Sequence, residues 1–286
     1  MPSGKPLNCV TPVSRHRWKR RTSVIKLGGE LLSNQRSLKK IARALVNATT
    51  RQPIVVVHGG GREIDEEMAK IGLKKLSIDG LRITDLDTLN VVLGVLAGRV
   101  NTKLVAAIVA AGGSAVGLTG TDASITPVNP ARRYLAINGS RVNLGFVGVP
   151  KNSGPPKLLN ELSKAGHVPV IASIGSDARG RLYNVNADTF AGNLAKRLKA
   201  KKLIIAGTTP GVIDQAGKTI PIVDDTLLNR LINEGQANAG MIAKLLACRD
   251  AYLAGVNHIT IVDGRSNRAL DINSSTKMTT VTKTIG

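Results

Sequence analysis

A short apolar strand runs directly into paired glycines in Val24-Ile25-Lys26-Leu27-Gly28-Gly29-Glu30. Val and Ile favour a buried β-strand. Glycine has no Cβ atom, so the backbone amides of such a turn can approach a phosphate oxygen closely. Lys26 adds a positive charge at the carboxyl end of the strand, where open α/β sheets bind their ligands. The stretch predicts an α/β protein with an anion-binding site at this turn.

The same arrangement recurs in Ile54-Val55-Val56-Val57-His58-Gly59-Gly60-Gly61. Taken alone, either turn is equally consistent with a tight connection between a strand and a helix. Two such turns in one chain indicate a site for an anionic substrate, with phosphoryl transfer as the leading case.

Composition limits the class of protein. The chain has 286 residues, of which 42% are hydrophobic and only 2% aromatic, so Leu, Ile, Val and Ala must fill the core. We find no uncharged apolar run of about 18 residues, and so predict no membrane span. Cys9 and Cys248 are the only cysteines. Two cysteines make neither a disulfide framework nor a zinc site, which favours a reducing, cytoplasmic setting.

The charge is strongly basic, at +21 with 40 Lys and Arg against 19 Asp and Glu. This balance favours anionic partners such as nucleotides, acidic substrates or an acidic protein. No arginine-rich recognition helix or cluster of stacking aromatics is present, so we predict no nucleic-acid partner. A generally basic host proteome would explain the charge equally well.

Strands and helices are predicted to alternate along the chain. Continuous apolar runs predict strands, and apolar residues at i, i+3, i+4 and i+7 predict helices. The strands are expected at residues 24–27, 54–57, 115–118, 168–172, 203–206 and 258–262, the last clear one. The helices are expected at residues 38–45, 63–70, 89–96, 104–111, 158–165, 191–198 and 240–252.

This alternation implies a mainly parallel sheet covered on both faces. We predict a three-layer αβα sandwich with two lobes, residues 23–178 and 179–286, divided at a turn over residues 175–180. Residues 125–148 are polar and punctuated by Gly and Pro, as expected of hairpins at a rim or lid. Residues 1–22 hold three prolines and a basic cluster without any acidic residue, and are predicted to be a disordered tail.

Several known motifs for phosphate or acyl chemistry are absent. Gly217-Lys218-Thr219 has the ending of a Walker A loop, but residue 212 is Val where that loop requires Gly. Protein-kinase signatures, a G-x-S-x-G elbow and a Rossmann G-x-G-x-x-G are not found. The histidines show no metal-ligand spacing, and we predict no metal site made of protein ligands.

Five motifs occur in the order and spacing of the amino acid kinase family, which the chain resembles over residues 23–286. The motifs are Lys26-Leu27-Gly28-Gly29, His58-Gly59-Gly60-Gly61, Gly80-Leu81-Arg82-Ile83-Thr84-Asp85, Asn184-Val185-Asn186-Ala187-Asp188 and Gly240-Met241-Ile242-Ala243-Lys244. Two further stretches resemble the family, Leu144-Gly145-Phe146-Val147-Gly148 and Val262-Asp263-Gly264-Arg265. Five ordered motifs are far more specific than any one of them.

The resemblance implies the amino acid kinase fold and phosphorylation of the γ-carboxylate of N-acetyl-L-glutamate by ATP, a step of arginine biosynthesis that yields an acyl phosphate and ADP. A carboxylate with a pKa of about 4 is already ionised at neutral pH, so it needs no general base. The difficulty is that one anion must approach another. Catalysis then consists of positioning and charge stabilisation.

The resemblance also implies catalytic roles for Lys26, Lys244 and Asp188. Lys26 would neutralise the transferring phosphoryl group, and Lys244 would bind phosphate from the C-terminal lobe. Asp188 would orient both lysines. Because Asp is also a preferred helix N-cap, a capping role stays open as the alternative for Asp188.

Binding residues follow from the same resemblance. Gly60, Gly61, Arg82 and Asn184 would hold the substrate: the glycines by main-chain groups and Arg82 by forking onto the α-carboxylate. Asn186 is a weaker candidate, and a plain surface arginine is the alternative for Arg82. Backbone amides of Gly28 and Gly29 would bind phosphate. The nucleotide pocket would be shaped by Thr208, Gly211, Gly240 and Met241, and Mg²⁺ would arrive with ATP, held largely by phosphates and water.

The chain departs from the family pattern in its nucleotide loop, where Gly207-Thr208 stands in place of the common Thr-Asp. A catalytically silent regulator that binds acetylglutamate or nucleotide is therefore one alternative. The basic charge suggests another, a kinase for glutamate or aminoadipate attached to an acidic carrier protein. Arginine-inhibited relatives use an N-terminal helix to link dimers into hexamers. Prolines in residues 1–22 disfavour that helix, so we predict a homodimer without arginine feedback.

Overall fold

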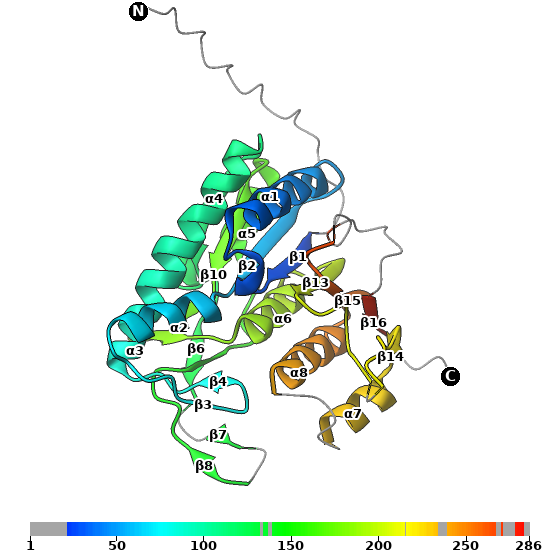
Figure 1. Ribbon diagram of the computed structural model, residues 1–286. Helices are drawn as coiled ribbons and strands as arrows, with labels where there is room; N and C mark the ends of the chain where they lie inside the picture. The colour runs from blue at the N-terminus through cyan, green and yellow to red at the C-terminus, as the bar shows by residue number, and fades with distance from the viewer. Residues whose placement is uncertain are drawn as a thin grey trace, which may run out of the picture.

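A single sheet with helices on both faces forms the body of the protein (Figure 1). The structure is a computed structural model that describes residues 22–131, 134–136, 139–214, 216–233, 239–266, 270 and 278–282. All but the last residue of the predicted tail 1–22 lies outside these ranges, as do Cys9 and the end of the chain beyond residue 282.

The eight-stranded sheet has the strand order β14-β16-β15-β13-β1-β2-β10-β5. Its strands are β1 (Ser23–Leu27), β2 (Ile54–His58), β5 (Ala115–Thr119), β10 (Val168–Ala172), β13 (Lys202–Gly207), β14 (Ile222–Val223), β15 (His258–Asp263) and β16 (Met278–Val281). Every pairing is parallel except that of β15 with β16. The predicted mainly parallel sheet is confirmed.

Helices cover the sheet in two layers. One layer consists of α1 (Gln35–Thr49), α2 (Gly61–Lys70), α3 (Leu86–Leu93) and α4 (Asn101–Ala110), and the other of α5 (Lys157–Lys164), α6 (Ala187–Arg197), α7 (Asp225–Asn233) and α8 (Ala239–Leu253). Side chains of β1 alternate between the layers: Ile25 and Leu27 pack with the first, and Val24 with the second. Lys26 therefore points to the side of α6 and α8, because alternate strand residues share a face.

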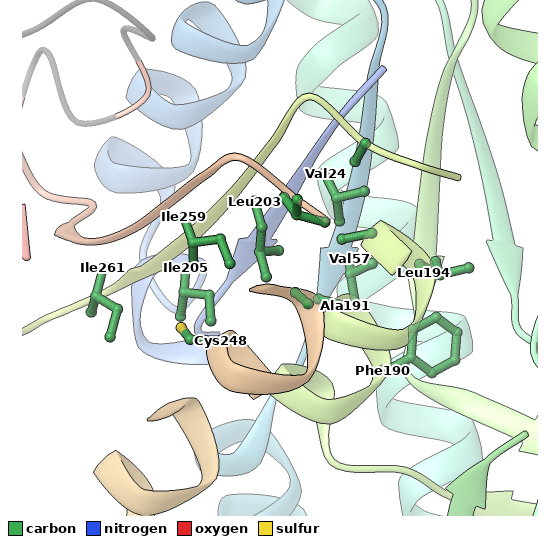
Figure 2. Packing of buried hydrophobic residues seen from close by; sticks show 14 of the residues in the cluster. Val24, Val57, Phe190, Ala191, Leu194, Leu203, Ile205, Cys248, Ile259 and Ile261 are labelled. Carbon is green, nitrogen blue, oxygen red and sulfur yellow. The ribbon is translucent and has the colours of Figure 1, made fainter. Parts of the chain in front are cut away.

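The core beneath α6 and α8 is built mainly from small and branched side chains, with Phe190 as its largest fully buried member. Figure 2 shows Val24, Leu203 and Ile259 of the sheet facing Ala191 of α6 and Cys248 of α8. Burial raises the pKa of the Cys248 thiol far above its usual range, so Cys248 is a neutral core residue rather than a reactive one.

Residues 86–110 form one unbroken helical run of α3, the π-helical segment η2 (Gly94–Val100) and α4. Sequence analysis predicted two helices here. Within the part of the chain that the structure describes, this run, Leu86–Ala110, is the one helix long and apolar enough to cross a membrane. Its apolar character has another explanation, because Val92, Leu104 and Ile108 are buried against the sheet.

Short hairpins form the rim beside the carboxyl ends of the central strands. They pair β3 (Ser77–Ile78) with β4 (Leu81–Arg82), β6 (Val128–Pro130) with β9 (Gly148–Pro150), β7 (Tyr134–Leu135) with β8 (Arg141–Val142), and β11 (Ile174–Ser176) with β12 (Leu182–Asn184). Hairpins were predicted for residues 125–148, and the pairings of β6–β9 and β7–β8 confirm them. The stretch 175–180, predicted as a turn, is partly a strand that pairs with β12.

The far edge of the sheet was not predicted. Sequence analysis took residues 258–262 as the last clear strand, but β14 and β16 extend the sheet beyond β15, and α7 covers them. β14 is only two residues long, and β16 reads Met-Thr-Thr-Val. Neither carries the continuous apolar run by which the other strands were recognised.

Candidate active site

A cleft of about 260 Å³ opens at the carboxyl ends of β1, β2 and β10. Parallel α/β sheets commonly bind ligands at this edge. Most of the predicted site residues line the cleft together, namely Lys26, Gly28, Gly29, Gly60, Gly61, Arg82, Asn184, Asp188 and Lys244. The sequence motifs thus meet in one place although they are spread over more than two hundred residues.

One carboxylate stands between two lysines in this cleft. Lys26 Nζ lies 2.8 Å from Asp188 Oδ1, and Lys244 Nζ lies 4.0 Å from Asp188 Oδ2. Lys26 comes from the sheet, and Asp188 and Lys244 come from the facing helices α6 and α8. The site therefore gathers two ammonium groups around one carboxylate, which leaves an excess of positive charge at the cleft.

Asn186, not Asp188, caps helix α6. The Asn186 side-chain oxygen accepts hydrogen bonds from the backbone N–H of Asp188 at 2.9 Å and of Thr189 at 3.1 Å. This is the usual N-cap arrangement. The alternative reading of Asp188 as the cap is thereby wrong, and its carboxylate is directed to the lysines.

The two glycine turns touch each other across the cleft. A Cβ atom on Gly29 would lie 2.7 Å from the Cα atom of Gly60, closer than packing allows. The Gly28 N–H already donates to the Ala206 carbonyl at 2.9 Å, as part of the sheet. An anion could therefore use the amide of Gly29 rather than that of Gly28.

Gly60 and Gly61 have different surroundings. A Cβ atom on Gly60 would meet Leu96 Cδ2 at 2.7 Å and Val100 Cγ2 at 3.3 Å, whereas a Cβ atom on Gly61 would meet nothing within 4 Å. Gly61 begins helix α2, whose first N–H groups and dipole favour negative charge. Gly60 is needed for packing, and Gly61 borders open space at an anion-attracting helix end.

Arg82 is held against helix α2. Its guanidinium pairs with Asp65 and donates to the Gly61 carbonyl at 3.2 Å. Its side chain is 10% exposed, so the alternative of a plain surface arginine is wrong. Asp65 also pairs with Lys75 at 2.8 Å, and hydrogen bonds from Lys75 and Arg82 hold the pKa of Asp65 below its usual value against the opposing effect of burial.

Asn184 connects the cleft to its rim. The Asn184 side-chain amide donates to Thr84 Oγ1 at 3.2 Å, and its backbone N–H donates to the Phe146 carbonyl at 2.9 Å. Thr84 and Phe146 both lie in stretches that resemble the family. The contacts bring these stretches to one wall of the cleft.

Of the residues predicted to bind the nucleotide, Gly28 and Gly29 line the cleft, whereas Thr208, Gly211, Gly240 and Met241 lie outside its lining. Thr208 follows β13, and its carbonyl accepts a hydrogen bond of 2.7 Å from Arg265, which also pairs with Asp263. Gly211 has a φ of +146° and lies against Thr279 of β16. Gly240 and Met241 lie in the first turn of α8, one turn before Lys244. Lys244 Nζ donates a hydrogen bond to the Gly240 carbonyl at 3.3 Å.

His58, at the end of β2, is completely buried below the second glycine turn. Burial lowers the pKa of His58 to about 4, so the imidazole is neutral at physiological pH. The ring therefore supplies no positive charge to the cleft.

Several residues of the cleft were not predicted, among them Leu96, which packs on Gly60, and Ser173, which follows β10 directly at the ligand-binding edge. Glu63 was not predicted either; it lies behind Gly29, outside the cleft lining. Burial raises the pKa of Glu63. A polar residue just after a predicted strand was a signal for Ser173, whereas nothing in the pattern around Leu96 marks it as part of a site.

Comparisons with known proteins identify the family of the chain. The model of the amino acid kinase family matches residues 21–263. An acetylglutamate kinase from Rhodopseudomonas palustris is 40% identical over 260 residues, covering 89% of this chain and 87% of that one. An acetylglutamate kinase from Gloeobacter violaceus is 41% identical over 254 residues, covering 87% and 82%. The N-acetylglutamate synthase from Neisseria gonorrhoeae, solved with coenzyme A and N-acetyl-glutamate, has a TM-score of 0.78 at 21% identity, covering 92% of this chain and 59% of that one, and supports the fold alone.

The family match and the relatives named acetylglutamate kinase identify the chain as a phosphotransferase. The chain belongs to the amino acid kinase family. The family, the fold and the reaction class predicted from sequence, a kinase that acts on a carboxyl group, are confirmed.

Proposed function

We propose that this cleft transfers the γ-phosphoryl group of ATP to the γ-carboxylate of N-acetyl-L-glutamate, giving N-acetylglutamyl 5-phosphate and ADP in arginine biosynthesis. The observation that carries the proposal is the pair of lysines, Lys26 and Lys244, that face one carboxylate in a glycine-lined cleft. The relatives named acetylglutamate kinase supply the identity of the acceptor.

The lysines neutralise charge in this mechanism. As the acceptor carboxylate approaches the phosphoryl group, negative charge accumulates on the oxygens between them. Lys26 and Lys244 place ammonium groups there from opposite sides, and Asp188 keeps both in position. Such fixed charges are among the largest contributions to catalysis because they need no rearrangement during the reaction.

The glycine turns bind by their backbones. Gly29 is the better donor to phosphate, since the Gly28 amide is engaged in the sheet. Gly28 contributes by its lack of a side chain, which leaves room at the turn, since a Cβ atom there would lie 2.5 Å from Glu30 Oε2. On the other turn, the start of α2 at Gly61 offers an N-terminal helix end to the acyl substrate.

Arg82 binds the substrate α-carboxylate with the donors that it has left. Its Nη2 donors are directed to Gly61 and Asp65, and one Nη1 donor is directed to the Met68 sulfur. Because a guanidinium carries five N–H donors, the Nε–H and the second Nη1–H have no partner among the described residues and can serve the substrate. Asn184, beside Thr84, holds the substrate from the opposite wall.

Thr208, Gly211, Gly240 and Met241 accommodate the nucleotide beside the cleft, and Mg²⁺ enters with the phosphates. Among the described residues, no three His, Cys, Asp or Glu side chains gather in a way that could hold a metal ion. Phosphate oxygens and water would therefore supply most Mg²⁺ ligands, as is common in kinases.

The two predicted lobes would divide the task. Residues 23–178 would bind the acyl amino acid and form the homodimer, and residues 179–286 would bind ATP.

One assay tests this function. The full chain is incubated with ATP, Mg²⁺ and N-acetyl-L-glutamate in the presence of hydroxylamine, which converts an acyl phosphate to a hydroxamate. We expect ADP and hydroxamate in equal amounts, and neither with Lys244→Met. Turnover only on glutamate attached to an acidic carrier protein would favour the carrier alternative, which the charge of +21 motivates. ATP binding without any ADP release would make the protein a regulator.

A further inference from the structure

A buried hydrogen-bond chain leads from a helix to the second glycine turn. His58 Nδ1 lies 3.1 Å from the Gly59 carbonyl, and His58 Nε2 lies 3.0 Å from the side-chain nitrogen of Asn101. His58 is fully buried and Asn101 is 4% exposed. Neither residue lines the cleft, so this chain approaches the glycine turn from behind.

The position of Asn101 determines which imidazole nitrogen carries the proton. The Asn101 side-chain nitrogen also donates to the Val170 carbonyl at 2.9 Å, and the Leu118 carbonyl lies farther from it, at 3.4 Å. Its two hydrogens therefore serve the two nearer acceptors, the Val170 carbonyl and His58 Nε2. If the nitrogen and oxygen of the Asn101 side-chain amide were exchanged, the amide oxygen would face the Val170 carbonyl oxygen, and neither could donate. The amide nitrogen must therefore face both Val170 and His58. His58 Nε2 is then an acceptor, and the proton of the neutral ring resides on Nδ1, where it donates to the Gly59 carbonyl.

The π-helical segment η2 makes this contact possible. The Asn101 N–H donates to the Leu96 carbonyl, five residues earlier, which is the hydrogen-bond pattern of a π-helix. Residues five apart point about 140° apart in an α-helix of 3.6 residues per turn, but lie on nearly the same side of a π turn. Leu96 packs on Gly60 while Asn101 reaches His58, so one wide turn supports the glycine loop at two points.

The consequence for the cleft comes from peptide geometry. The C=O and N–H groups of a planar trans peptide point in opposite directions. When His58 holds the Gly59 carbonyl toward the core, the Gly60 N–H of the same peptide must point away from the core. The buried chain therefore determines the direction of a backbone donor at the site that we assign to the acyl substrate.

From these contacts we infer that His58 and Asn101 are positioning residues, which, through the π turn, hold the Gly59–Gly60 peptide in the orientation that binds the acyl amino acid. The inference rests on the proposed function, since it assigns a task to the substrate side of that site. His58 acts as a fixed Nδ1–H donor and takes no part in proton transfer.

Two substitutions of His58 separate its two nitrogens. The amide nitrogen of Asn can take the place of Nδ1, whereas that of Gln reaches the place of Nε2. Loss of one hydrogen bond corresponds to roughly tenfold in affinity. We expect His58→Gln to raise the KM for N-acetyl-L-glutamate about tenfold more than His58→Asn does, with the KM for ATP nearly unchanged in both. His167→Gln is the control, because His167 contacts Ser114 at the opposite end of β10.

A second measurement does not depend on activity. Nitrogen-15 NMR of the histidine-labelled full chain at pH 7 should show a His58 ring protonated on Nδ1 alone, and Asn101→Asp should change that state because a carboxylate accepts from Nε2–H. A wild-type ring protonated on Nε2 would overturn the inference even if the chain is an active kinase. Equal KM values for His58→Gln, His58→Asn and wild type would overturn it too. Absence of turnover in wild type with the Nδ1 signal present would instead count against the proposed function.

Discussion

The two lysines of the cleft share one carboxylate but differ in their surroundings. The Lys26 side chain is 7% exposed and lies in direct contact with Asp188, whereas the Lys244 side chain is 20% exposed and more distant. Removing one member of a buried ion pair leaves the other without compensation. The contribution of Lys26 is thus to stability and to charge at the site, and that of Lys244 is mainly to charge.

Lys26→Met and Lys244→Met should therefore separate activity from stability. Both should lower kcat by at least about a hundredfold, because a charge aimed at the transition state is lost. Lys26→Met should also reduce the free energy of unfolding by about 3 kcal/mol, seen as a lower Tm, and Lys244→Met should leave Tm nearly unchanged. Equal Tm values for the two variants, measured by calorimetry, would show that the Lys26–Asp188 pair contributes nothing to stability.

The neighbouring glycines of the second turn offer another matched pair. Gly60→Ala would force a Cβ atom against the buried side chains of Leu96 and Val100, whereas Gly61→Ala has room. We expect Gly60→Ala to lower Tm and raise the KM for the acyl substrate. Gly61→Ala should keep the wild-type Tm but still raise that KM, since its methyl group would occupy space next to the helix end assigned to the substrate. Unchanged KM values for Gly61→Ala would place the substrate elsewhere.

At the scale of elements, continuous apolar runs were enough to predict the central strands, because a strand buried on both faces has no polar side. The same rule could not find β16, whose Thr279 turns inward to donate to the Ile220 carbonyl and accept from the Val212 N–H. The π segment was equally invisible, since its residues are ordinary helix formers apart from Gly94 and Gly98. Its geometry depends on what Leu96 and Asn101 contact, which no local pattern contains.

In the candidate site too, some features could be predicted from the sequence and others depend on contacts between distant segments. Motif resemblance assigned Lys26, Asp188 and Lys244 to one site, and the structure brings their side chains into one cleft. Lys26 and Lys244 belong to a predicted strand and a predicted helix, whereas Asp188 precedes the helix predicted at residues 191–198. The resemblance could not tell that the Gly28 amide is engaged in the sheet, or that Asn186 caps α6. Both facts depend on pairing between segments that are distant in sequence or on a single cap geometry.

Helix α6 also anchors the loop between β9 and α5. Arg197 is 8% exposed, and its guanidinium donates to the carbonyls of Ser153, Gly154 and Ile125. Burial lowers the pKa of Arg197, although a guanidinium stays charged. An arginine with several fixed donors can satisfy these carbonyls at once, which the single ammonium of lysine cannot do with the same geometry.

Arg197→Met should leave these carbonyls without a buried donor and cost about 2–3 kcal/mol of unfolding free energy. We expect a lower Tm and faster proteolysis within residues 151–156, with Arg197→Lys between wild type and Arg197→Met. Arg181→Met is the control, since Arg181 pairs with Asp177 at an exposed position. The loop lies away from the cleft lining, so KM values should stay near those of wild type; a large change in KM would refute this purely structural role.

For the whole molecule, the sheet joins what sequence analysis separated into two lobes. Strand β1 pairs with β2 on one side and with β13 on the other, so the ladder continues without a break from β5 to β15. The cleft lies over the carboxyl ends of the strands at this junction. Conditions that destabilise the central strands should therefore affect the fold as a whole, rather than one lobe alone.

Acid is such a condition, because His58 lies at the end of β2. Its pKa is lowered from 6.5 to about 4 by burial, so the unfolded chain takes up a proton between these values and the folded chain does not. When the unfolded state binds more protons, the free energy of unfolding rises with pH. The stability linked to His58 is thus fully present above pH 6.5 and is lost as pH falls toward 4, by about 3 kcal/mol in total.

Chemical denaturation at a series of pH values between 7 and 4 tests this expectation. Wild type should lose stability steadily over this window, and His58→Asn, although less stable at pH 7, should show a flatter dependence because its side chain does not titrate. Hydrogen bonds hold the pKa of Asp177 at about 2 despite burial, so its own loss of stability begins at more acidic pH and does not imitate the effect. Parallel curves for wild type and His58→Asn would mean that His58 has the same pKa in the folded and unfolded chain, and would remove the reason for the neutral donor assigned to it.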